Sequence, residues 1–412
     1  MNAQADISVI DGAAAWRRMI LALALSTIGG IGFWSVVVVL PVIQVEFAID
    51  RGSASTPYLA TFLSFAVGGI IMGRLADKFG VIVPVMLGGT MLGLGYFGAA
   101  AATELWQFIV AQALFIGCLG SSATFGPLVA DVSLWFRRRR GIAVAIVASG
   151  NYLSGTIWPP IIQYGVDTVG WRQTHVAIGI VCIAAILPLA LLLRRRAPID
   201  PHEGQPAAGA NLSTGPTGIP RPPGVQWLLV LAGMACCIAM ATPQVHIVAY
   251  CGDLGYGAQR GAEMLSVMLG LGVVSRISFG LIADKIGGLG ALLVSSSLQM
   301  VAMFFYLPFD GLTSLYIVSG LFGLAQGGIV PSYALIARDY FPANQAATRI
   351  SLVLMATVAG MAVGGWMAGE IYDYTGSYRA AFLNGIGWNV LNVSIALMLL
   401  WHRKRPRAMA TG

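Results

Sequence analysis

Charged side chains are scarce in this sequence. Only 10% of its 412 residues are Asp, Glu, Lys or Arg, whereas soluble domains carry about 25%. So few charges cannot cover the surface of a water-soluble globule of this size. Because 57% of the residues are hydrophobic, the composition predicts a protein that is solvated largely by lipid.

Residues that make metal and catalytic sites are also few. The sequence has four histidines and five cysteines, and the cysteines form no CxxC or other metal-ligand pattern, so we interpret them as packing residues. No nucleophile–base pair stands out. We therefore expect no enzyme activity, no cofactor and no metal site. No cleavable signal pattern precedes the first apolar run, which is long enough to remain as an anchor.

Long apolar runs dominate the rest of the chain. A spanning helix needs roughly 20 mostly apolar residues, and twelve runs qualify. Continuous runs exclude a closed barrel, whose strands would alternate. We expect spans at about 17–40, 57–76, 83–102, 106–131, 141–163, 173–193, 225–250, 260–283, 290–308, 312–336, 347–371 and 379–400.

The basic residues predict the orientation of these spans. With both termini in the cytoplasm, 19 of the 24 Lys and Arg residues fall on the cytoplasmic side, as the positive-inside rule requires. This distribution accounts for the pI of about 9.3 without a nucleic-acid partner. We expect a multi-pass monomer in the cytoplasmic (inner) membrane, with the lipid bilayer as its surroundings.

The chain divides into two similar parts. Residues 194–224 contain seven prolines and five glycines, which predicts a flexible cytoplasmic linker between a bundle at 1–193 and a bundle at 225–412. Residues 73–80 recur at 280–287, a shift of 207. Trp171-Arg172 matches Tyr378-Arg379 with the same shift. The fold class is therefore all-α, with two pseudo-symmetric six-helix bundles, a pattern typical of transporters that rock around a central site.

The repeated segment carries a resemblance to a known family. Gly73-Arg-Leu-Ala-Asp77-Lys-Phe-Gly80 is similar to the G-x-L-A-D-x-x-G motif of the major facilitator superfamily, and the resemblance covers almost the whole chain. It implies gating roles at the cytoplasmic ends of the spans at 57–76 and 260–283, where an aspartate can accept bonds from a helix N-terminus. The residues expected to serve the gate are Gly73, Arg74, Asp77, Lys78, Gly80, Gly280, Asp284 and Gly287.

Within that superfamily the chain resembles the monocarboxylate transporter branch, including bacterial oxalate/formate-type relatives. The stretches that carry this resemblance are 135–141 with 148–150, 245–250 with 253–255, and 275–280. The sequence departs from animal monocarboxylate carriers at Gly272, where they have an acidic residue. Residues 350–369 lack the basic residue of the oxalate type, which argues against a doubly charged substrate.

One cation lies deep in an expected span. Arg276 stands about eight residues from the cytoplasmic end of the span at 260–283, roughly 12 Å at 1.5 Å per residue. A charge at this depth is costly unless it faces protein or water. Its side chain leans away from the nearer interface, which disfavours snorkelling. No acidic residue lies at mid-membrane depth nearby, so we expect Arg276 to bind a carboxylate through its planar fork. The resemblance implies the same role.

Other candidates for substrate contact are aromatic or polar residues within the expected spans. His246 has a side chain that titrates near neutral pH, so it is a candidate proton or substrate site, with a satisfied interfacial histidine as the alternative. The rest are either packing residues or substrate contacts. They are Trp34, Phe125, Asn151, Gln326 and Tyr333.

The sequence therefore predicts a secondary active transporter that moves a small monocarboxylate, such as lactate, pyruvate or a hydroxy acid, by alternating access. Proton symport is left open. Two alternatives within the superfamily remain, namely an efflux antiporter for hydrophobic compounds and an organic-anion exchanger. A non-transporting sensor or membrane enzyme is the alternative from another class.

Overall fold

The computed structural model describes residues 10–136, 138–195, 222, 224–341 and 343–404. Most of the predicted linker falls outside these residues. Within them, eleven helical stretches are long and apolar enough to cross a membrane. The protein is therefore a multi-pass, all-helical membrane protein, as its composition predicts.

The helices of the first half form six spans. The bounds of its elements are α2 Ala13–Gly29, α3 Ile31–Glu46, α4 Arg51–Phe79, α5 Ile82–Ala101, α6 Leu105–Val110, η1 Ala111–Ser121, α7 Gly126–Trp135, α8 Arg140–Ala148, α9 Gly150–Val169 and α10 Trp171–Leu191. Five spans are single helices or pairs in tandem, and α6, η1 and α7 together make the remaining one, which is the fourth.

The second half begins with α11. Its elements are α11 Val225–Asp253, α12 Ala258–Phe305, α13 Leu312–Gln326, α14 Ile329–Tyr340, α15 Ala343–Thr375 and α16 Tyr378–Lys404. Helices α13 and α14 share one span.

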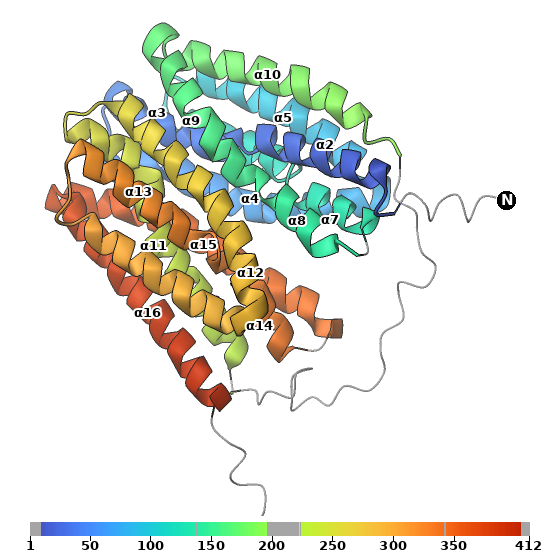
Figure 1. The fold of residues 1–412 in the computed structure, drawn as a ribbon. Helices are drawn as coiled ribbons and strands as arrows, with labels where there is room; N and C mark the ends of the chain where they lie inside the picture. Colours follow the sequence, from blue (N-terminus) through green and yellow to red (C-terminus); the bar gives the residue numbers. More distant parts are fainter. Residues whose placement is uncertain (1–9, 137, 196–221, 223, 342, 405–412) are drawn as a thin grey trace, which may run out of the picture.

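Helix α12 holds two spans. Its 48 residues would reach about 72 Å at 1.5 Å per residue, more than twice the roughly 30 Å of a hydrocarbon core. Gly287 interrupts it with φ 76° and ψ 164°, and the chain reverses there (Figure 1). Segments 258–286 and 288–305 therefore cross separately. The expected twelve helices in two six-helix bundles are confirmed.

The repeated motif has one backbone conformation in both halves. Gly80, between α4 and α5, has φ 86° and ψ 163°, close to the angles of Gly287. This region of backbone space is open essentially to glycine alone. The last glycine of each motif copy therefore makes the sharp reversal between two spans.

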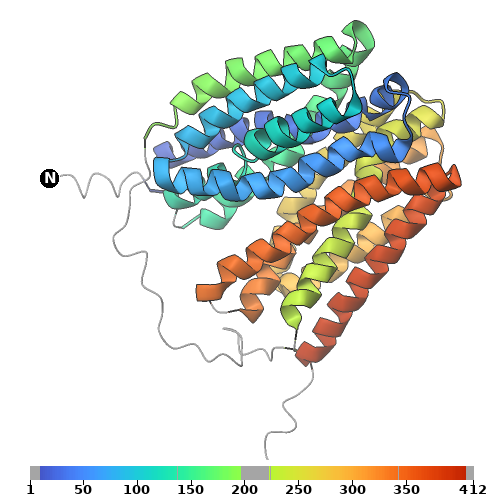
Figure 2. The ribbon, with the colours of Figure 1, turned by 180° about the vertical axis from the view of Figure 1, so that it is seen from behind.

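The halves meet along two long helix pairs, α4 with α15 and α9 with α12, and α3 also contacts α11. Helices α2, α7, α8 and α14 pack against elements of their own half. Figures 1 and 2 show the halves close together where α3 ends and α4 begins, and apart where α2 begins and α16 ends. We call the first the Arg51 end and the second the terminal end.

Several spans are less regular than the apolar runs predict. The first span breaks at Gly30, the fifth at Ser149, and the tenth at Gly327–Gly328. The fourth contains the π-helix η1 and then a non-helical break at residues 122–125. π-Helical turns and broken helices are frequent at functional sites. These interruptions lie near the middle of the molecule, so we expect a functional site there.

Candidate functional site

The side chain of Arg276 lies between the two halves rather than in lipid. Its Nη1 donates to the backbone carbonyl of Ala148 at 3.0 Å, and that residue ends α8 in the first half. Its Nε is buried without a hydrogen-bond partner. Among the described residues, no carboxylate forms an ion pair with it. The guanidinium therefore keeps an unneutralised charge at an interface between protein elements.

A tyrosine ring covers one face of this guanidinium. The Arg276 Cζ lies 4.3 Å from the ring centroid of Tyr152 on α9, a cation–π geometry. The ring fits because residue 272 is glycine. A Cβ there would lie 2.7 Å from two ring carbons of Tyr152. Tyr152 and Gly272 together fix where the guanidinium can lie.

A buried amide pair lies beside the same ring. The Gln244 Nε2 donates to the Gln326 Oε1, which joins α11 to α13, and the Gln326 Nε2 has no partner. That nitrogen would be 3.6 Å from a Cβ on Gly272. We call Arg276, Tyr152, Gln244 and Gln326 the Arg276 cluster. Its two unpartnered N–H donors, from Arg276 and Gln326, suit an anion or another acceptor.

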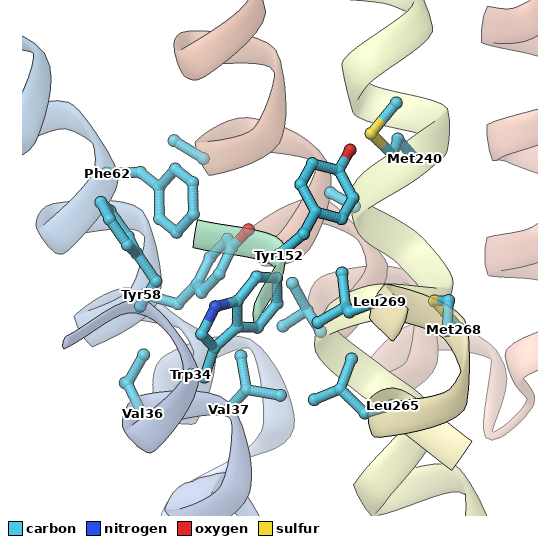
Figure 3. Packing of buried hydrophobic residues seen from close by; sticks show 14 of the residues in the cluster. Trp34, Val36, Val37, Tyr58, Phe62, Tyr152, Met240, Leu265, Met268 and Leu269 are labelled. Carbon is cyan, nitrogen blue, oxygen red and sulfur yellow. The ribbon is translucent and has the colours of Figure 1, made fainter. Parts of the chain in front are cut away.

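Trp34 and Asn151 extend the Arg276 cluster on the side of the first half. The indole Nε1 donates to the Asn151 carbonyl at 3.0 Å, and the Asn151 Oδ1 is buried without a partner. Figure 3 shows Trp34 facing Leu269 of the second half, with Leu265 farther along the same helix, and Tyr152 pointing toward Met240. An apolar wall therefore adjoins the polar groups.

Phe125 belongs to a separate aromatic group. It lies in the break before α7, and its ring centroid is 6.1 Å from that of Phe65. Phe65 in turn contacts Phe33 at 4.8 Å, and Phe33 contacts Phe62 at 4.7 Å. These rings come from α3, α4 and the break in the fourth span, so Phe125 packs within the first half.

Tyr333 is held inside the second half. Its ring is fully buried in α14, and its hydroxyl donates to the Asn392 Oδ1 at 2.6 Å. Asn392 also donates to the Ser296 Oγ at 2.8 Å. In this conformation Tyr333 therefore has a structural partner, and the described contacts do not bring it to Arg276.

His246 lies at a different level of the bundle. Its Nδ1 is 3.1 Å from the Tyr378 hydroxyl, and its Nε2 is 2.7 Å from the Gly365 carbonyl. His246 is seven residues from the end of α11, about 10 Å from the Arg51 end, whereas Arg276 is 18 residues into α12, about 27 Å from it. The two predicted site residues are thus separated along the bundle axis.

The Tyr378 hydroxyl also joins His246 to an ion pair between the halves. Arg51, the first residue of α4, donates to that hydroxyl at 2.5 Å and to both carboxylate oxygens of Asp253 at 3.1 and 3.2 Å. Just before it, Asp50 caps α4, and hydrogen bonds from Ser53 lower the pKa of the Asp50 carboxyl. We call Arg51, Asp253, Tyr378 and His246 the Arg51 cluster.

The motif residues lie at the terminal end and are mostly exposed. Arg74, Asp77 and Lys78 are exposed, as are Gly280 and Asp284. Within the described part of the chain, neither aspartate has a hydrogen bond or an ion pair. The halves are apart at this end, so the predicted bonds to a helix N-terminus are not formed in this conformation.

Broken helices meet beside the candidate site. A Cβ on Gly30 would lie 2.9 Å from Ser154, and one on Gly150 would lie 2.7 Å from Ser26. A Cβ on Gly29 would collide with Thr124. The breaks of the first, fourth and fifth spans therefore pack on one another through small residues. Asn151 and Tyr152 come directly after Gly150 in the chain, so this junction lies next to the Arg276 cluster.

A family model fits this architecture. The model described as Major Facilitator Superfamily matches residues 22–318. The chain belongs to the Major Facilitator Superfamily. This superfamily is one of transporters, so the molecule is a membrane transporter with a twelve-helix fold.

Curated relatives within the superfamily differ in their described roles. The chain is 27% identical over 346 residues to monocarboxylate transporter 13 of Bos taurus, which covers 82% of this chain and 79% of the relative. It is 26% identical over 339 residues to the agnestins efflux protein AgnL12 of Paecilomyces divaricatus, covering 81% of this chain and 76% of that protein. Relatedness at this level establishes the superfamily but not the substrate.

Solved structures agree with the fold. A POT family transporter in complex with 5-aminolevulinic acid superposes with a TM-score of 0.73 at 13% identity, over 94% of this chain and 96% of that chain. At such identity the likeness bears on the fold alone.

Sequence reasoning missed four residues of these clusters. Tyr152 stands next to the predicted Asn151, but nothing in the sequence shows that its ring faces Arg276. Gln244 lies in an apolar run and could have been noticed as a second polar residue near mid-depth. Arg51 was not singled out in the sequence, and its partner Asp253 was noted only within the stretch 253–255 of the resemblance.

Proposed function

We propose that this transporter moves a small monocarboxylate across the cytoplasmic membrane by alternating access, and that Arg276 binds the carboxylate. One observation on Arg276 carries the proposal. Arg276 is a charged group between the two halves whose Nε is buried without a partner, and within the described residues no acid neutralises it.

A bound anion would complete the bonding of this side chain. A buried donor without an acceptor costs free energy that a carboxylate oxygen recovers. The guanidinium fork can offer two parallel bonds to a carboxylate. The Gln326 amide adds a further donor near the same ring, and the wall around Trp34, Leu265 and Leu269 suits the organic part of the substrate.

The pairing of the buried arginines supports a substrate with one carboxylate rather than two. Arg276 is partly exposed, and the buried arginines of the described residues are Arg18 and Arg51. Arg18 is paired with Asp131 at 2.7 Å, and Arg51 with Asp253 at 3.1 Å. Within the described residues, Arg276 is then the cation that we assign to the substrate, and a second carboxylate would have no comparable partner there.

The orientation and the two-bundle organisation follow from the charges. Because most basic residues fall at the terminal end, we place that end, both termini and the 194–224 linker in the cytoplasm. The conformation described here is then closed toward the outside and open toward the cytoplasm. A monomer suffices for this cycle, since both halves of the site come from one chain.

Uptake into proteoliposomes tests the role of Arg276. We expect the wild type to accumulate a labelled monocarboxylate chosen by a thermal-shift screen of lactate, pyruvate, hydroxy acids and aromatic acids. Arg276→Ala should reduce uptake to that of empty liposomes. Arg276→Lys should keep a minor part, because it keeps the charge but loses the planar fork.

Arg260→Ala is the matched control for that experiment. Arg260 lies on the same helix, is exposed and pairs with Glu263 at 3.0 Å, so its loss should leave uptake unchanged. Normal anion uptake by both Arg276 variants would remove Arg276 from the site. Export of a hydrophobic compound that is insensitive to Arg276 would favour the efflux alternative, which the relative AgnL12 supports.

We assign His246 as the proton site if transport is coupled to protons. We expect His246→Gln to abolish the part of uptake that an inward proton gradient drives, while exchange of internal for external substrate continues. His175→Gln is the control, since His175 is also buried but lies in α10. Gradient-driven uptake that survives in His246→Gln would exclude this site, and strict exchange in the wild type would favour an organic-anion exchanger.

A further inference from the structure

The Arg51 end is held shut by bonds that cross between the halves in two ways. The first is the side chain of Arg51, which is 6% exposed and reaches from α4 to Asp253 and Tyr378 of the second half. The Arg51 Cζ also lies 4.7 Å from the ring centroid of Tyr372. One arginine of the first half is thus enclosed by acidic and aromatic groups of the other.

The second way is a helix cap supplied across the interface. The backbone N–H groups of Arg51 and Gly52, in the first turn of α4, donate to the two carboxylate oxygens of Asp373 at 2.9 and 2.5 Å. First-turn N–H groups have no partner within their own helix, and a carboxylate there is favourable. A Cβ on Gly52 would collide with Glu370, so glycine permits this approach of α15 to α4.

The internal repeat gives this arrangement a counterpart within the first half. The shift of 207 that aligns the motif copies also aligns Glu46 with Asp253, Trp171 with Tyr378, and Arg172 with Arg379. In the first half these positions bond to one another. Glu46 accepts from the Trp171 Nε1 and from the Arg172 Nη2 at 2.5 Å.

The second half breaks that symmetry. Asp253 and Tyr378 both accept from Arg51 of the first half, although Tyr378 also contacts His246 of its own half. Arg379, the counterpart of Arg172, is exposed, and in the described residues its side chain forms no ion pair. The arginine that the repeat would supply to Asp253 is therefore present and unused.

We propose that Asp253 is a gating residue with two alternative partners: Arg51 when the Arg51 end is closed, and Arg379 when it is open. In the open state the second half would then adopt the acid–arginine pair that Glu46 and Arg172 already form in the first. Such an exchange keeps the Asp253 carboxylate paired with a cation in both states. The proposal does not depend on which solute is carried.

Distances between spin labels at the Arg51 end test this switch in the full-length protein in liposomes. Thr103→Cys in the first half and Asp310→Cys in the second are exposed loop positions, and the parent protein without them measures labelling of the native cysteines. We expect the wild type to populate mainly the short distance. Asp253→Asn and Arg51→Gln should raise the population with a long distance, roughly tenfold relative to the short one, the factor for one charged hydrogen bond.

Arg379→Gln is the decisive variant, because the switch predicts the opposite shift. Removing the partner of the open state should deplete the long distance further and slow transport. Arg379 is exposed and forms no ion pair with another described residue, so this variant is expected to fold even if Arg51→Gln does not. Arg260→Gln, which alters another exposed arginine of this end, should leave the distances unchanged.

Two results would overturn the proposal. If Asp253→Asn leaves the distance distribution as in the wild type, Asp253 does not hold the gate. If Arg379→Gln leaves the distances unchanged or lengthens them, Arg51 is a simple lock and Asp253 has no second partner. Neither result bears on Arg276, whose role is measured by substrate uptake.

Discussion

The guanidinium of Arg276 owes its position to a ring and a carbonyl rather than to an acid. The Tyr152 ring lies under it at 4.3 Å, and the Ala148 carbonyl accepts one of its N–H groups. A carboxylate in that place would cancel the charge that the proposed anionic substrate needs. A ring attracts the cation more weakly and leaves its edge available, so Tyr152 orients Arg276 without competing with an anion.

Substitution of Tyr152 tests this role. We expect Tyr152→Phe, which keeps the ring, to bind substrate with nearly wild-type affinity. Tyr152→Leu should weaken binding about 2- to 30-fold, which corresponds to a cation–π contribution of about 0.5–2 kcal/mol. Titration of purified protein gives both affinities, with Tyr164→Leu as a control at an exposed tyrosine. Equal affinities for the Phe and Leu variants would show that the ring does not matter.

The sequence singles out Arg276 as a candidate, whereas its surroundings cannot be predicted from it. A lone arginine in an apolar run is visible because its cost in lipid is so high. Tyr152 is 124 positions away, and only the packing of α9 on α12 brings its ring to the guanidinium. Gly272 was noted as a departure from a family pattern, and the structure gives its physical reason, which is room for that ring.

At the scale of elements, two glycines set the path of the chain. Gly80 and Gly287 both have φ near +80° and ψ near +160°, and each reverses the chain between two antiparallel spans. The first glycine of the motif is different, because a Cβ on Gly73 or Gly280 would meet nothing within 4 Å. The last position of the motif thus requires glycine for its backbone conformation, whereas the first position has room for a side chain in this conformation.

Alanine substitutions separate these positions. We expect Gly287→Ala to lower the free energy of unfolding by about 1–3 kcal/mol, the cost of a non-glycine residue in this backbone region. Gly280→Ala should leave stability unchanged, because that position is helical and open. Thermal unfolding of the purified variants measures the difference. A Gly287→Ala protein as stable as Gly280→Ala would contradict the backbone argument.

Hydrophobic runs predicted the spans well but not their interruptions. All twelve runs correspond to membrane-crossing segments, since an apolar run of sufficient length has few other structures open to it. The breaks at Gly30, Ser149 and residues 122–125 were not predicted, because they depend on small side chains of three spans packing together. The ends of several spans also extend beyond the apolar runs, as in α15, which continues to Thr375.

At the scale of the whole molecule, one end is closed and the other is open. The Arg51 cluster joins the halves at one end, while Asp77 and Asp284 at the other end are exposed and have no partner within the described residues. Alternating access requires the reverse state, in which the terminal end closes. The two aspartates then become available to accept bonds from helix N-termini of the opposite half.

Neutral variants of these aspartates test that assignment. We expect Asp77→Asn to slow transport severalfold by destabilising the state closed at the terminal end, with substrate affinity in the conformation described here little changed. The measurements are the maximal uptake rate in proteoliposomes and the affinity in titration. A loss of affinity with an unchanged maximal rate would instead place Asp77 in substrate binding.

The central claim is that Arg276 binds the carboxylate of the substrate. Isothermal titration of purified wild type, Arg276→Lys and Arg276→Ala with the monocarboxylate that the wild type takes up fastest tests it most directly. We predict a dissociation constant at least about 100-fold higher for Arg276→Ala, since two charged hydrogen bonds are lost, and an intermediate value for Arg276→Lys. The same dissociation constant for all three proteins would contradict the claim.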